Sequence, residues 1–157
     1  QKWLVDKLSN NLVDYFDSDD TDYGDKIFEN RHYKSVEISN GNLILEYTEK
    51  ITTSYRSFSD NKPSINEIKV IIPFHKITNM DFDNHKTFTG ECDFEIYTKS
   101  NSITQINLTK GDKYFYSYHD FTFNCSEEEN LGSRINKAIM HIKNLTPHKR
   151  KRKNEIF

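Results

Sequence analysis

The chain has 157 residues, with 22 basic and 24 acidic side chains and a formal net charge of −2. This length suits one domain, and an aromatic fraction of 13% excludes a chain that is disordered throughout. No apolar run approaches the roughly 18 residues that a membrane-spanning helix needs. The sequence therefore predicts a soluble protein with a single folded domain.

The first 16 residues are predicted to form an amphipathic helix. Apolar side chains recur there on one face of a 3.6-residue period, at Trp3, Leu4, Leu8, Leu12, Val13 and Phe16. Residues 17–32 are predicted to be an acidic linker, because like charges accumulate before Gly24. The carboxylates between residues 17 and 25 do not follow the order of an EF-hand loop, so we predict no calcium site.

From Tyr33 onward the apolar period changes from 3.6 to 2, which indicates strands. Asn40 and Gly41 separate two alternating runs and predict a two-residue hairpin turn. Such a turn places Val36 opposite Leu45, Ile38 opposite Leu43 and Lys34 opposite Tyr47.

Five further strands are predicted over residues 67–74, 77–82, 92–98, 103–108 and 114–125. Pro73 should mark the end of a strand, and Cys92, Phe94 and Ile96 should face inward. Seven consecutive strands without intervening helices favour antiparallel sheets arranged as a barrel or a sandwich.

The last predicted element is an amphipathic helix over residues 126–145. Ser126 and Glu129 have the spacing of a capping box, and Pro147 should end the helix. Its apolar stripe consists of Leu131, Ile135, Ala138, Ile139, Ile142 and Leu145. Because an exposed stripe would promote aggregation, we expect it to cover an opening or a face of the sheet.

This order of elements resembles the pleckstrin-homology-like (PH-like) fold, in which a C-terminal helix closes one end of a bent barrel. Residues 71–77 are similar to the central strand-turn-strand of bacterial members, and residues 126–145 to their closing helix. The resemblance spans residues 33–146 and implies an α+β, mainly β, seven-stranded antiparallel barrel or sandwich. Many bacterial members, some of them exported, have no assigned activity, so the resemblance implies a fold more than a function.

Phosphoinositide-binding members of the PH family carry basic residues around the loop between their first two strands. The corresponding loop here, residues 39–42, has no cation. One phosphate needs a higher concentration of positive charge, so phosphoinositide binding is not expected.

No catalytic motif, cofactor-binding motif or metal-ligand spacing is present, so we predict neither an enzyme nor a cofactor. His119 beside Asp120 has the composition of a general base with an orienting carboxylate. Ordinary polarity of a loop between aromatic runs is the favoured interpretation. For Cys92 and Cys125, separate reduced thiols are favoured over a bridge, which would need an oxidising compartment.

Two stretches are candidate interaction surfaces. Tyr114, Tyr116 and Tyr118 alternate, so their rings share a face that is either core, which is favoured, or an aromatic patch. The tail over residues 147–157 has a local net charge of +4 and contains five consecutive cations: Lys149, Arg150, Lys151, Arg152 and Lys153. Because the body of the chain is acidic, contact with nucleic acid is not favoured.

These observations predict a non-catalytic binding or interaction module whose ligand is an unidentified protein or peptide, which exposed strand edges can accept. A small-ligand carrier with a lipocalin-like cavity is one alternative, and contact of the tail with nucleic acid or an anionic surface is another. A periplasmic or secreted location is slightly favoured over the cytoplasm.

Overall fold

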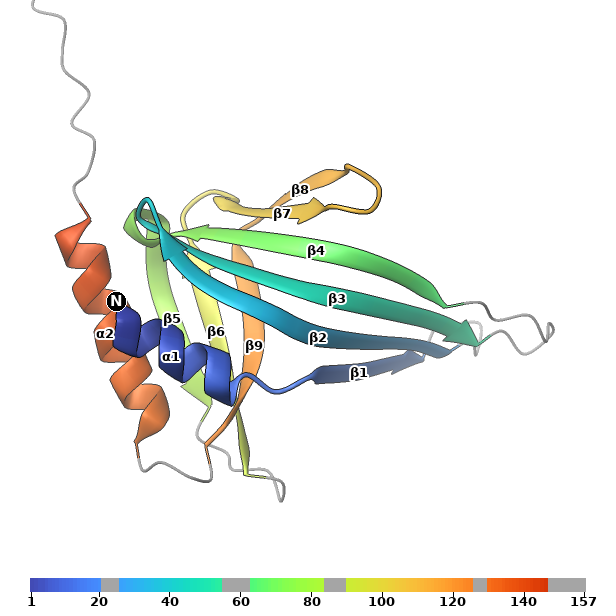
Figure 1. Ribbon diagram of the computed structural model, residues 1–157, viewed down its shortest axis with the longest axis horizontal. Helices are drawn as coiled ribbons and strands as arrows, with labels where there is room; N and C mark the ends of the chain where they lie inside the picture. The colour runs from blue at the N-terminus through green and yellow to red at the C-terminus, as the bar shows by residue number, and fades with distance from the viewer. Residues whose placement is uncertain (21–25, 55–62, 84–89, 126–129, 147–157) are drawn as a thin grey trace, which may run out of the picture.

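A computed structural model of the chain describes residues 1–20, 26–54, 63–83, 90–125 and 130–146. Within these ranges it contains two α-helices, one short 3-10 helix and nine strands (Figure 1). In chain order they are α1 (Lys2–Asn11), β1 (Tyr15–Asp20), β2 (Lys26–Ser39), β3 (Asn42–Ser54), β4 (Ser64–Pro73), η1 (Phe74–Lys76), β5 (Ile77–Asp83), β6 (Glu91–Thr98), β7 (Ile103–Asn107), β8 (Lys113–Tyr116), β9 (Tyr118–Asn124) and α2 (Leu131–Leu145).

The strands form two antiparallel sheets. The large sheet has the order β1-β2-β3-β4-β7-β8 and the small sheet the order β5-β6-β9. The small sheet crosses one end of the large one at a steep angle, and β2, β3 and β4 extend well beyond it (Figure 1). The α+β, mainly β class is thus confirmed, whereas the closed barrel of seven strands is wrong. In the described residues the two sheets keep separate edges, because the chain changes sheet at Ser117 instead of continuing one strand from 114 to 125.

The predicted hairpin is confirmed in its turn and in its register near the turn. Asn40 and Gly41 have φ values of 50° and 76°, as a type I′ turn requires. Val36 pairs with Leu45 and Ile38 with Leu43. Further from the turn, an irregularity between Tyr33 and Ser35 shifts the register, so Tyr33 instead of Lys34 lies opposite Tyr47.

The sheet also continues into residues 17–32, where an acidic linker was expected. β1 pairs with β2 from Tyr15 opposite Arg31 to Asp20 opposite Lys26. The long β2 would otherwise present unpaired backbone groups along that edge, and pairing with β1 satisfies them. The middle of the acidic stretch, residues 21–25, lies outside the described residues.

Aromatic rings fill the space between the sheets. Phe94 lies at the centre, with ring centroids 5.2 Å from Phe121, 5.9 Å from Phe123 and 6.1 Å from Phe82. The predicted inward positions of Cys92, Phe94 and Ile96 are confirmed, since all three are at most 1% exposed. Burial of side chains of this size supplies much of the hydrophobic stabilisation of a domain.

The two helices pack together at the end of the sandwich where the small sheet lies (Figure 1). Helix α2 buries Leu131, Ile135, Ile139 and Ile142 of the predicted stripe, whereas Leu145 is 67% exposed. Its N-cap is Asn130 and not the predicted Ser126, because the described helix begins at Leu131; residues 126–129 lie outside the description.

Helix α1 is shorter than predicted and ends at Asn11. It buries Leu4 and Leu8, and the guanidinium of Arg134 in α2 lies 5.0 Å from the ring centroid of Trp3. The chain after α1 then contacts the small sheet. Leu12 forms an isolated bridge with Phe123, and the amide of Val13 donates to the carbonyl of Thr122 at 3.0 Å.

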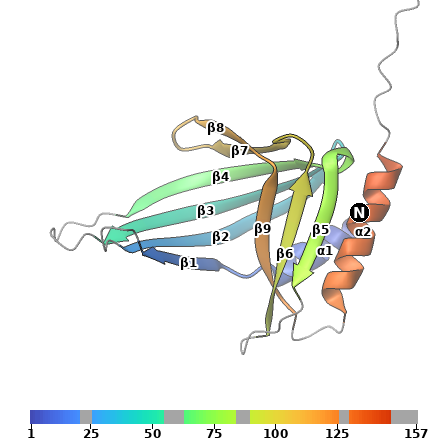
Figure 2. The same ribbon diagram turned by 180° about the vertical axis from the view of Figure 1, so that it is seen from behind.

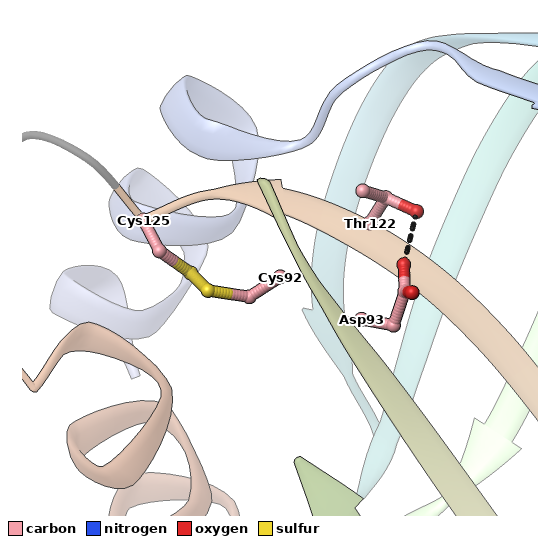
Figure 3. The surroundings of a disulfide bond; sticks show 4 residues. All are labelled: Cys92, Asp93, Thr122 and Cys125. Atoms are coloured by element: carbon pink, nitrogen blue, oxygen red, sulfur yellow. Dashed lines mark hydrogen bonds between the residues drawn. A yellow bond between two sulfur atoms is a disulfide. The ribbon is translucent and has the colours of Figure 1, made fainter. Parts of the chain in front are cut away.

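Cys92 and Cys125 form a disulfide, with their Cα atoms 5.9 Å apart (Figure 3). The expectation of two separate reduced thiols is therefore wrong. β6 and β9 pair up to Glu91 opposite Asn124, and the amide of Cys125 donates to the carbonyl of Gly90 at 2.9 Å. This pairing places Cys125, which directly follows β9, next to Cys92. The spacing of the two cysteines in the sequence does not indicate which strands pair, so it could not predict the bond.

Gly132 in the first turn of α2 provides a test of the contact between this helix and the small sheet. A Cβ atom at this position would lie 2.0 Å from Cζ of Phe82. Because the Phe82 ring also packs against Phe94, Gly132→Ala is expected to lower the free energy of unfolding by about 1 to 3 kcal/mol. Urea unfolding followed by circular dichroism measures this loss.

The neighbouring exposed residue supplies the control. Ser133→Ala adds the same helix-favouring residue without the contact, and it should leave the stability unchanged or slightly higher. A Gly132→Ala protein as stable as the wild type would contradict the close packing of α2 on Phe82.

Candidate functional site

The three tyrosines predicted as an interaction surface or as core are exposed. Tyr114 is 47% exposed, Tyr116 43% and Tyr118 39%, so the favoured core interpretation is wrong. β8 is an edge strand of the large sheet, and the chain crosses to the small sheet at Ser117. These rings consequently flank the junction between the sheets and are not covered by either.

Tyr116 and Tyr118 face an open groove of about 300 Å³, which we name the junction groove. Its lining comes from both sheets, and β9, the edge of the small sheet, is the strand of that sheet next to the extended half of the large one (Figures 1 and 2). Strands β2, β3, β7, β8 and β9 contribute its lining: Glu29, Arg31, Glu49, Gln105, Tyr116, Tyr118, His119 and Asp120.

Strand geometry explains how charged side chains from β2 and β3 enter the groove. Glu29 and Arg31 are two residues apart on β2 and therefore lie on one face of the sheet. The register places Glu49 of β3 directly opposite Arg31. Without the irregularity between Tyr33 and Ser35, Arg31 would face Lys50 instead, so the bulge determines the charge of the groove.

Arg31 joins the two sheets electrostatically. Its Nε donates to Oε1 of Glu29 at 2.5 Å and its Nη1 to Oδ1 of Asp120 at 3.4 Å, while its side chain is only 15% exposed. Its guanidinium also lies 5.8 Å from the ring centroid of Tyr47. Burial alone would lower the pKa of Arg31, but its interactions with Tyr47 and with the carboxylates of Glu29 and Asp120 outweigh it and raise that pKa.

The other carboxylate of the groove is less well compensated. Oε2 of Glu49 accepts a hydrogen bond from the side-chain amide of Asn66 at 3.3 Å. Burial and the nearby charge of Glu29 raise the pKa of Glu49 above its usual value. The hydrogen bond from Asn66 and the charges of Arg31 and Lys110 reverse only part of that shift. Negative charge is therefore in excess on this side of the groove.

The exposed tyrosine on β9 is held by a partner on the neighbouring strand. The hydroxyl of Tyr118 donates to Oε1 of Glu95 at 3.3 Å, and its ring centroid lies 5.3 Å from that of Tyr97. Burial and the charges of Asp120 and Glu95 raise the pKa of Tyr118, so its hydroxyl stays protonated at neutral pH. These contacts orient one face of an aromatic ring at the rim.

His119 is a buried strand residue and not the loop residue that the sequence suggested. It is 6% exposed, and its Nε2 is buried without a hydrogen-bond partner in the described part of the chain. Burial, followed by the positive charge of Arg31, lowers the pKa of His119 to about 4. The imidazole is therefore neutral at pH 7 and presents an unpaired ring nitrogen at the wall of the groove.

The groove thus combines three carboxylates, one guanidinium already paired with two of them, a neutral imidazole and two exposed phenol rings. Over the described ranges no group of three or more His, Cys, Asp and Glu side chains has the arrangement of a metal site. Polar groups held in fixed positions beside exposed rings can bind a ligand and determine its orientation.

The sequence identified only part of this site. Tyr116 and Tyr118 come together in it, and Tyr114 lies one step away on the same face of β8. The tail residues, Lys149, Arg150, Lys151, Arg152 and Lys153, lie outside the described residues. Glu29, Arg31 and Glu49 were missed, although the charged residues Glu29 and Arg31, two positions apart, were a signal of a polar strand face.

Comparison of the chain with protein families, curated proteins and solved structures finds no match. Neither described helix has the length and apolar character needed to cross a membrane. The fold and the junction groove therefore carry the functional argument.

Proposed function

We propose that this protein is a non-catalytic binding module and that the junction groove is its ligand site. The observation that carries the proposal is the exposure of Tyr116 and Tyr118 at the rim of a groove whose lining includes the largely buried Arg31. Large aromatic rings exposed beside fixed polar groups are typical of recognition sites. Contacts to neighbouring strands orient Tyr118 and Arg31 before a ligand arrives, which lowers the entropic cost of binding.

The chemistry of the lining supports binding more than catalysis. None of the described lining residues is Ser, Thr or Cys, so His119 has no such nucleophile beside it within the groove. A base must also reach the proton that it abstracts, and His119 is nearly buried.

The PH-like scaffold remains part of the proposal. It is supported by two packed antiparallel sheets and by a C-terminal helix against β5 and η1 at one end of the sandwich. The turn at Asn40 and Gly41 carries no cation, which argues against phosphoinositide as the ligand. The disulfide supports an oxidising compartment, in keeping with an exported bacterial protein that binds a protein or a peptide.

The alternative of a lipocalin-like carrier gains no specific support. The space between the sheets, where such a ligand would lie, is occupied by Phe74, Phe94, Phe121 and Phe123, all at most 1% exposed. Contact of the basic tail with nucleic acid or an anionic surface rests on residues outside the described ranges.

A screen by two-dimensional ¹H–¹⁵N NMR tests the proposed site. Amino acid amides, amines, neutral sugars and dicarboxylates serve as probes, and those that bind should shift the amide signals of residues 116–120 and of Arg31. Replacing both Tyr116 and Tyr118 by Ala should weaken binding at least tenfold, because each exposed ring contributes on the order of 1 kcal/mol or more.

Phe115→Ala is the matched control for this experiment. Phe115 is 56% exposed on the same strand, but its side chain lies on the opposite face from Tyr116. Its removal should leave affinity unchanged. If the probes shift signals only elsewhere, or if the double tyrosine variant binds them as the wild type does, the junction groove is not the ligand site.

A further inference from the structure

The junction groove has more negative than positive charge in its lining. Glu29 and Asp120 share the single guanidinium of Arg31, whereas Glu49 accepts its hydrogen bond from an uncharged amide. Two carboxylates close together repel each other, which is reflected in the contribution of Glu29 to the raised pKa of Glu49. The charges of Arg31 and Lys110 offset this repulsion only in part, and a positive charge of a ligand beside Glu49 would relieve it further.

A second, independent feature of the groove also points to a ligand. The buried Nε2 of His119 has no hydrogen-bond partner in the described part of the chain. Burial and Arg31 keep the imidazole neutral, and in the tautomer that carries its proton on Nδ1 the unpaired Nε2 is an acceptor. An unpaired buried acceptor costs about 1 to 3 kcal/mol, and a ligand N–H group at Nε2 would recover part of it.

The rim supplies the third requirement, a surface for the apolar part of a cation. Tyr116 and Tyr118 present exposed rings on two sides of the chain crossover. Aromatic rings attract cations through their negative faces, and this chain uses that contact elsewhere. The Nζ of Lys113 lies 5.3 Å from the ring centroid of Phe115.

We propose that the junction groove binds an organic cation, an alkylammonium or a guanidinium group, between the carboxylate of Glu49 and the rings of Tyr116 and Tyr118. One N–H of the cation is donated to Nε2 of His119, and the others reach Glu49. This inference rests on the proposed binding function and names its ligand class. The same chemistry is found in a Lys or Arg side chain of a peptide and in a free polyamine.

Calorimetric and NMR titrations with matched probes test the ligand class. N-acetyl-arginine amide, N-acetyl-lysine amide and spermidine carry the cation, whereas N-acetyl-glutamine amide and N-acetyl-glutamate amide are neutral and acidic controls. The cations should bind, and the controls should bind at least about tenfold more weakly, in accordance with the strength of charge-assisted hydrogen bonds.

Glu49→Gln keeps the shape of the side chain and removes its charge, and it should weaken binding of the cations about tenfold or more. Its burial favours the neutral form, so the variant is expected to fold, which unfolding in urea verifies. Glu37→Gln is the matched control, because Glu37 is an exposed residue of the same strand as Arg31, outside the groove. It should leave the affinity for the cations unchanged.

The source of the cation is distinguished by a third set of probes. An extended pentapeptide with one central Arg should bind more tightly than N-acetyl-arginine amide if the natural ligand is a peptide, and spermidine should bind more tightly than either if it is a polyamine. Binding of the neutral or acidic probes in preference to the cations would overturn this inference and leave the binding function intact. If no probe of any charge shifts the groove, both proposals are wrong.

Discussion

Loss of the Cys92–Cys125 disulfide is expected to lower the free energy of unfolding by about 3 to 4 kcal/mol. The bond closes a loop of 33 residues in sequence separation, and the chain-entropy model assigns that much stabilisation to such a loop because the unfolded chain loses freedom. Cys92 is also buried beside the central aromatic cluster, so the bond holds the end of β9 against β6 where the core lies.

Two altered forms of the protein separate the contribution of the covalent bond to stability from that of the cysteine side chains. Urea unfolding is compared for the oxidised wild type, the wild type reduced with dithiothreitol and the Cys92→Ala/Cys125→Ala protein. Both altered forms should lose stability by similar amounts. A reduced wild type within about 1 kcal/mol of the oxidised one, well below the range typical of disulfides, would show that the bond does not contribute in this way.

Replacement of Arg31 by Met is expected to lower the free energy of unfolding by about 3 kcal/mol. Met retains most of the apolar volume, but Glu29 and Asp120 lose the cation that both of them contact. Removal of one partner from a largely buried ion pair is costly because the remaining charges stay desolvated. The contact between β2 and β9 at the junction groove should weaken accordingly.

A second measurement identifies this effect with the charge of Arg31. That charge is one of the causes, after burial, that lower the pKa of His119 to about 4. NMR titration of the imidazole in Arg31→Met should therefore give a higher pKa for His119 than in the wild type, because the protonated imidazole is no longer repelled by the charge of Arg31.

The ion pair between Lys69 and Glu46 supplies the control for stability. Its atoms lie 2.8 Å apart, but the side chains are 30% and 37% exposed. Lys69→Met should cost no more than about 1 kcal/mol, as is usual for exposed pairs. Equal losses in the two variants would contradict the special position of Arg31 between the sheets.

Local patterns in the sequence were sufficient for the elements whose partners are close in the chain. The Asn40-Gly41 turn determines the pairing of Val36 with Leu45, because a two-residue loop admits one register. The apolar stripe of α2 was equally readable, since its spacing alone defines the face that Ile135, Ile139 and Ile142 bury.

Features that depend on long-range packing could not be predicted in the same way. The register shift between Tyr33 and Ser35 changes which residue of β3 lies opposite Arg31. Neither the strand propensity of these residues nor the apolar alternation of the sequence indicates a bulge at that position. The change of sheet at Ser117 divides an unbroken aromatic run, which periodicity indicates as one strand. The groove arises from both events together, so its charged half was missed while its tyrosines were found.

The first residues after α1 also affect how this protein can associate with copies of itself. Leu12 and Val13 lie along the end of β9, at Phe123 and Thr122. They occupy backbone groups that a strand from another molecule would use to extend the small sheet. The N-terminal segment therefore covers the end of the β9 edge and opposes pairing of that edge with a strand of another molecule. The remainder of β9 stays available to the groove.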